Sequence, residues 1–119
     1  MRENEELYQR LEILEGAGLI EKRVAEQTEK IIRLIYSGKP EVDAEKMEIF
    51  VTHIAMAMQR ILNGQKEEPL SEAVLKELQE EASYENAKSL AQKVYETVNI
   101  EFPMVEQEYL IVHLCNLFS

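Results

Sequence analysis

The sequence predicts an all-α protein, a compact bundle of five to six helices that forms one domain over residues 1–119. Apolar residues recur at three- and four-residue steps along most of the chain, which is the pattern of amphipathic helices. The chain has only 4 Gly and 3 Pro, and most of them fall between the periodic segments. With 119 residues, of which 45% are hydrophobic, it can bury an ordinary core without a disulfide framework.

Three helices are expected in the first half of the chain. The first, Asn4–Glu15, carries an apolar face of Leu7, Leu11 and Leu14 and ends at a pair of glycines that can take the left-handed conformation. The second runs from Ile20 to Tyr36 and stops before Pro40. The third, Asp43–Asn63, is the longest and most apolar, so we expect it to be the central helix. Its stripe consists of Met47, Phe50, Val51, Ile54, Met58, Ile61 and Leu62.

Three shorter helices are expected after a polar surface connection at residues 65–69. We expect Ser71 to be the N-cap of the fourth helix, because its hydroxyl can accept from a free amide of the first turn. The predicted buried face of this helix is Val74, Leu75 and Leu78. The fifth helix spans Tyr84–Val98, and the last, Met104–Leu117, begins just after a proline.

Charge and composition exclude several classes of function. A net charge of −10 argues against direct contact with nucleic acid, which depends on Lys and Arg neutralising phosphates. The lone Cys115 excludes an internal disulfide framework and a Cys-based zinc cluster. No apolar run approaches the roughly 18 residues of a membrane span. We therefore expect a cytoplasmic protein with no cofactor, no metal site and no membrane contact.

The two histidines, His53 and His113, both lie in strongly apolar helices. Arg60 lies two turns beyond His53 on the same helix face, and a histidine beside a guanidinium suits a phosphoryl group. Glu106 and Tyr109 share a face with His113, so a carboxylate or a phenol could fix the tautomer of that ring. The competing interpretation is that each histidine lies at the edge of the core and is satisfied by one hydrogen bond.

Other reactive side chains favour structural interpretations. Cys115 lies two residues after His113 and so points to another side of the helix, which favours a buried, inert thiol. Two histidines without a His-x-x-x-His pair or further ligands argue against a zinc site. The paired glutamates, Glu67 and Glu68 among them, are best taken as solvated surface.

Two motifs, in order along the chain, resemble the PTS regulation domain, the PRD, of bacterial transcriptional antiterminators and activators. The first consists of His53, Ala57, Arg60 and Gly64. The second consists of Pro103, Glu106, Tyr109, His113 and Leu114. The resemblance extends from about Leu7 to the end of the chain and includes an opening, Leu11-x-x-Leu14 with Gly18 and Ile20, that is seen in small stand-alone members of the family.

This resemblance implies a helical bundle that forms a homodimer and is controlled by the sugar phosphotransferase system. It assigns His53 and His113 as phosphoacceptors, Arg60 as a phosphate partner and Glu106 as the residue that orients the second histidine. The phosphoryl donor would be the histidine-containing phosphocarrier protein or an enzyme II component. A regulated partner protein would read the phosphorylated state, and the domain would not itself be an enzyme.

Two positions depart from the family pattern, and they keep other hypotheses open. Thr52 stands where an acidic residue usually precedes the first histidine, and Val105 replaces an acidic residue shortly before Glu106. The main alternative is therefore a degenerate PRD that is not phosphorylated and acts only in dimerisation or docking. An enzymatic alternative treats His53 and Arg60 as a phosphocarrier site that passes its phosphate onward.

Overall fold

The computed structural model describes residues 5–118, which fold into six α-helices. The helices are α1 (Glu5–Gly16), α2 (Lys22–Gly38), α3 (Ala44–Leu62), α4 (Glu72–Glu80), α5 (Tyr84–Thr97) and α6 (Met104–Phe118). The expected all-α bundle is therefore confirmed. Asn4, where the first helix was expected to begin, lies outside the described residues.

Glycines in the left-handed conformation end the first and third helices. Gly18, with φ of 76°, follows α1, and the Leu19 amide donates back to the Leu14 carbonyl at 3.0 Å. Gly64, with φ of 72°, follows α3, and the Gln65 amide donates to the carbonyl of Arg60 in the same way. These six-residue closures satisfy carbonyls that the helix itself leaves free, and glycine adopts the required φ without a steric penalty.

Side-chain caps begin the third and fourth helices. The Asp43 carboxylate accepts from the Lys46 amide at 2.9 Å, and the Ser71 hydroxyl accepts from the Val74 amide at 3.2 Å. Each bond satisfies one of the amide groups that have no partner inside a helix. The predicted N-cap role of Ser71 is confirmed.

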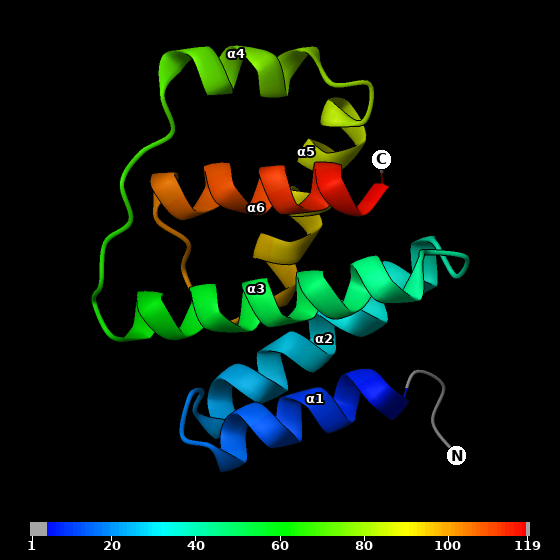
Figure 1. Ribbon diagram of the computed structural model, residues 1–119, viewed down its shortest axis with the longest axis vertical. Coiled ribbons are helices and arrows are strands. Elements are labelled where there is room, and N and C mark those ends of the chain that lie inside the picture. The colour runs from blue at the N-terminus through cyan, green and yellow to red at the C-terminus, as the bar shows by residue number, and fades with distance from the viewer. Residues whose placement is uncertain (1–4, 119) are drawn as a thin grey trace.

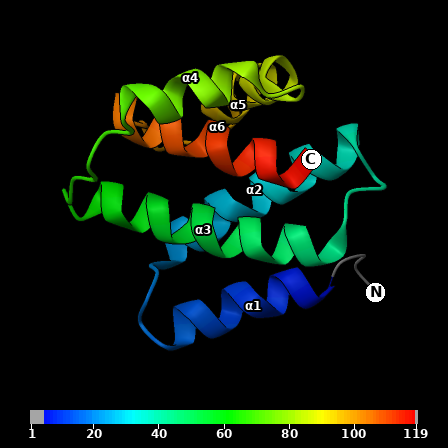
Figure 2. The same ribbon diagram turned by 45° about the horizontal axis from the view of Figure 1, so that its top comes forward.

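Helix α3 is the central element of the bundle, as expected. Helix α6 runs antiparallel beside it, α1 flanks it on the opposite side, and α2 crosses behind it (Figures 1 and 2). Helix α5 packs behind α6, and α4 lies at the outer edge next to α5 and α6 (Figure 1). The buried stripe of α3 contains Met47, Phe50, Val51, Ile54 and Met58, whereas Ile61 and Leu62 are only half-buried.

Two sequence-based expectations are wrong in detail. The second helix begins at Lys22 rather than Ile20, and Ile20 is instead a buried residue of the preceding turn. Val74 and Leu75 were expected in the buried face of α4, but Val74 is 42% exposed and Leu75 is only half-buried. The reason is that α4 buries only Leu78 and does not lie deep in the bundle. Among residues 5–118, none of the helices combines the length and apolar character that a membrane span needs.

Candidate functional site

The two histidines face each other across the seam between α3 and α6. Their ring centroids are 4.5 Å apart, and the ring planes are tilted by 57°. His53 projects from α3 and is exposed, whereas His113 projects from α6 and is half-buried. Neither imidazole makes a hydrogen bond to another described residue. The half-buried position of His113 fits the core edge, and the expectation that one hydrogen bond satisfies each ring stays a prediction.

A charged pair lies one step further along the same seam. Arg60 of α3 donates from Nη2 to Glu106 Oε1 at 3.2 Å and from Nε to Glu106 Oε2 at 3.4 Å. Each member lies seven residues from the histidine on its own helix. Because the helices are antiparallel, the histidine pair and the charged pair form two successive rungs, separated by about 10 Å along the helix axes. Glu106 is only 4% exposed, so Arg60 compensates a buried carboxylate.

Arg60 also contacts the connection between α3 and α4. Its Nε lies 3.0 Å from Oε1 of Glu67, a side chain that is 38% exposed. One residue later, the Tyr109 hydroxyl of α6 donates to the carbonyl of Glu68 at 2.8 Å. Glu67 and Glu68 were expected to be solvated surface; Glu68 is exposed, and the Glu67 side chain is 38% exposed but also pairs with Arg60.

The surroundings of His113 keep its ring neutral. Burial, and after it the nearby His53 and Arg60, lower the pKa of His113 from 6.5 to about 4. The protonated, cationic form of the ring is disfavoured, because the position is half-buried and lies near the Arg60 guanidinium. At neutral pH the ring therefore has an unprotonated nitrogen with a free electron pair.

An open cavity of about 400 Å³ adjoins the histidine pair. It is lined by Lys46, Ile49, Phe50, His53, His113, Asn116 and Leu117. Lys46 lies seven residues before His53, so it stands on the same face of α3 as His53 and Arg60. Ile49 is 61% exposed at the edge of this cavity and gives the site an apolar margin.

Thr52, which precedes His53, is tied into the neighbouring helix. Its hydroxyl accepts from Arg10 Nη1 of α1 at 3.2 Å and donates to the Glu48 carbonyl at 3.1 Å. Arg10 also forms an ion pair with the Glu48 carboxylate at 3.7 Å. Thr52, where the resemblance led us to expect an acidic residue, thus helps to hold α1 against α3.

The structure brings all four predicted site residues, His53, His113, Arg60 and Glu106, to one seam. Glu106 pairs with Arg60, and among the described residues it makes no hydrogen bond to His113, so its role in orienting that ring stays a prediction. Glu67 and Lys46 also belong to this site, although neither was predicted to do so from the sequence. The seven-residue spacing from His53 is a signal for Lys46, whereas no periodicity applies to the non-helical segment that contains Glu67.

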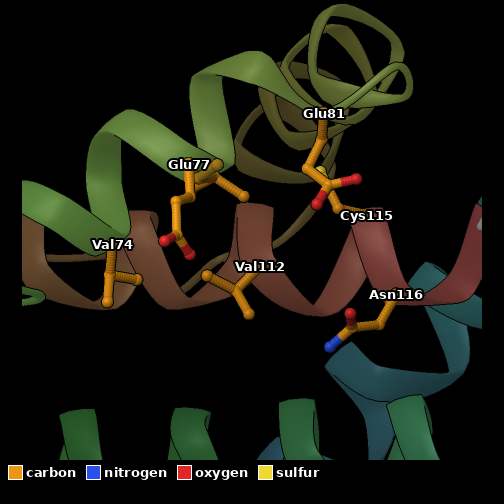
Figure 3. A pocket seen from close by; sticks show the side chains of 7 residues that line it. Val74, Glu77, Glu81, Val112, Cys115 and Asn116 are labelled. Atoms are coloured by element: carbon orange, nitrogen blue, oxygen red, sulfur yellow. The ribbon is translucent and has the colours of Figure 1, made fainter.

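Other candidate chemistry is not supported by the structure. Within the described part of the chain, no group of three or more His, Cys, Asp or Glu side chains is placed to hold a metal ion. Cys115 is 4% exposed and lines a different cavity, between α4 and α6 (Figure 3). Burial raises the pKa of its thiol, which makes it a poor nucleophile, as expected from the sequence.

Fold and site together define a small all-helical domain in which two interhelical histidines adjoin an arginine. The family model described as "PRD domain" matches residues 22–117, so the chain belongs to the PRD family. The match includes α2 to α6 and therefore both histidines. PRD domains are regulatory modules of the phosphotransferase system rather than catalytic ones.

A curated protein of similar size is related along nearly its whole length. It is "Uncharacterized protein YhfY" of Escherichia coli (strain K12), which is 26% identical over 110 residues, or 92% of each chain. No solved structure matches the sequence.

Proposed function

We propose that this chain is a phosphotransferase-system regulatory module whose histidines, His53 and His113, accept a phosphoryl group that a partner protein reads. The observation that carries the proposal is the contact of the two imidazoles, 4.5 Å apart, beside the guanidinium of Arg60. Membership of the PRD family supports it. The proposal places the protein in the cytoplasm, where such donors act.

The chemistry requires a neutral imidazole. The free electron pair of one ring nitrogen attacks phosphorus and forms an N–P bond, while the bond from phosphorus to the donor breaks and its electrons leave with the donor. The donor is the histidine-containing phosphocarrier protein or an enzyme II component. His113 is neutral at pH 7 because its pKa is about 4, and His53 is exposed to an approaching protein.

The product changes the charge of the seam. A phosphoryl group adds about −1.5 to −2 charges and strong acceptor oxygens, which a guanidinium binds well. Arg60 is the cation of the next rung, and Lys46 lines the cavity on the other side. We expect the modified face, with the exposed Ile49 at its edge, to contact a regulated partner or the second subunit of a homodimer.

Incubation with phosphoenolpyruvate and the general phosphotransferase proteins tests the proposal. Intact-mass spectrometry should show an acid-labile gain of one or two phosphates. The chain contains 2 His in all, so the double variant His53→Ala/His113→Ala should gain none. Gln92→Ala, on the exposed side of α5, is the matched control and should be modified like the wild type. Absence of a gain with every donor would refute the phosphoacceptor role and leave the fold untouched.

A second candidate function is docking or dimerisation without modification. It is favoured by Thr52, whose hydroxyl is committed to Arg10 and the Glu48 carbonyl, and by the exposed Ile49 beside the histidines. Analytical ultracentrifugation of unmodified wild type and Ile49→Lys discriminates the two. A dimer that Ile49→Lys dissociates, in a protein that no donor phosphorylates, would establish the docking function instead.

A further inference from the structure

The segment between α3 and α4, residues 63–71, is tied to the histidine seam by two contacts. Arg60 of α3 pairs with Glu67 at 3.0 Å, and Tyr109 of α6 donates to the Glu68 carbonyl at 2.8 Å. In Figure 1 this segment climbs from the end of α3 past the beginning of α6 to reach α4. The position of α4 is therefore connected mechanically to the two helices that carry the histidines.

Helix α4 itself is lightly attached to the bundle. Leu78 is its buried residue, and Val74 is 42% exposed. A cavity of about 290 Å³ separates α4 from α6, and Figure 3 shows Val74 and Glu77 on one side of it and Val112 on the other. A helix with so little buried surface opens at low free-energy cost, so its tether matters.

The two carboxylates on Arg60 are not equivalent. Glu106 is 4% exposed, and loss of its cation would leave a buried, uncompensated charge. The Glu67 side chain is 38% exposed, and an ion pair at such a position contributes little. When a stronger anion arrives, Glu67 is therefore the partner that Arg60 can release.

We propose that a phosphoryl group on His113 displaces Glu67 from Arg60. Phosphorylation thereby frees residues 63–71 and loosens α4. This inference rests on the proposed function. Side chains lean toward the N-terminus of their helix, which tilts Arg60 toward the histidine rung. The guanidinium has five N–H donors, so it can keep Glu106 while it binds phosphate. The added negative charge also repels the Glu67 carboxylate.

Hydrogen–deuterium exchange of the full chain tests the inference without any phosphotransferase protein. The His53→Asn variant retains one histidine, and treatment with phosphoramidate, a chemical phosphoryl donor, places the phosphoryl group on His113. We expect amide exchange in residues 63–80 to rise about two- to fivefold on modification, the factor that corresponds to loss of a surface ion pair. Exchange in α3 should stay unchanged, because its buried stripe is not affected.

Two charge-neutralising variants separate the tether from phosphorylation. Glu67→Gln in the unmodified protein should reproduce the faster exchange of residues 63–80. Glu68→Gln removes the same charge one residue later but keeps the carbonyl that accepts from Tyr109, so it should exchange like the wild type. Modified Glu67→Gln should show no further increase.

These experiments test the displacement of Glu67 and the phosphoacceptor function separately. If the Glu67→Gln and Glu68→Gln variants exchange alike, or if modified His113 leaves residues 63–80 as slow as before, the inference is overturned. Failure of the phosphotransferase proteins to phosphorylate the chain would refute the proposed function. In that case the phosphoramidate experiment would still show whether a phosphate on His113 displaces Glu67.

Discussion

The neutral ring of His113 makes the stability of the fold dependent on pH. Its pKa falls from 6.5 to about 4 in the folded chain, first because of burial and then because of His53 and Arg60. Between these values the unfolded state binds a proton that the folded state does not. The stability that the neutral His113 ring gives the folded state is therefore fully present above pH 6.5 and is lost as the pH falls toward 4.

The size of the effect follows from the two pKa values. Proton linkage with 6.5 in the unfolded chain and about 4 in the folded chain gives a loss of about 2 kcal/mol between pH 7.5 and pH 5. His113 is half-buried, so solvent screening reduces the expected loss to about 1–2 kcal/mol.

Urea unfolding of the wild type and His113→Asn measures this loss. Both proteins carry the same carboxylates, so their acid titration cancels in the difference between the two free energies of unfolding. We expect acidification from pH 7.5 to pH 5 to lower the free energy of unfolding of the wild type by about 1–2 kcal/mol relative to that of His113→Asn. NMR titration of the ring protons gives the pKa directly, with a midpoint for His113 near 4.

A difference that stays constant with pH, or a His113 midpoint near 6.5, would refute the reasoning that burial keeps the ring neutral. His53→Asn is the informative second variant, because it removes one cause of the lowered pKa and keeps the largest. Its His113 midpoint should move upward but remain below 6.5.

Three further substitutions test the packing by urea unfolding. Arg60→Met leaves the buried Glu106 carboxylate without its cation and should lower the free energy of unfolding by about 2–3 kcal/mol, and adding Glu106→Gln should recover part of that loss. Met58→Ala, at a fully buried position of α3, should cost about 2–4 kcal/mol, whereas the exposed Met104→Ala should cost little. Ser71→Ala removes the cap of α4 and should cost about 1 kcal/mol, with a larger rise in amide exchange in α4 than elsewhere.

Much of the fold could be predicted because its signals are local. The glycine after α3 and the serine before α4 act through bonds between residues three to five positions apart, so the sequence around them is sufficient. The stripe of α3 is equally direct, since a spacing of three and four residues places side chains on one face. Val74 shows the limit of this rule: it has the right spacing, but no helix covers it.

The site was predictable only in part, because its contacts join different helices. Helix periodicity places Glu106 and His113 on one face of α6, and it places His53 and Arg60 on one face of α3. It does not say which pairs meet when the two helices pack antiparallel. The structure pairs histidine with histidine and arginine with glutamate, whereas the sequence suggested that Glu106 serves His113.

The spacing of the charged residues along α3 explains how a strongly acidic chain can carry a phosphoryl group. The net charge of −10 opposes further negative charge in general. On α3, however, the seven-residue spacing puts Lys46 and Arg60 on either side of His53, one lining the cavity and the other forming the next rung. Because Arg60 is already shared between a buried and an exposed carboxylate, an added anion must compete for it. The acidic surroundings therefore turn phosphate binding into an exchange of partners, and the exposed Glu67 is the partner that such an exchange sets free.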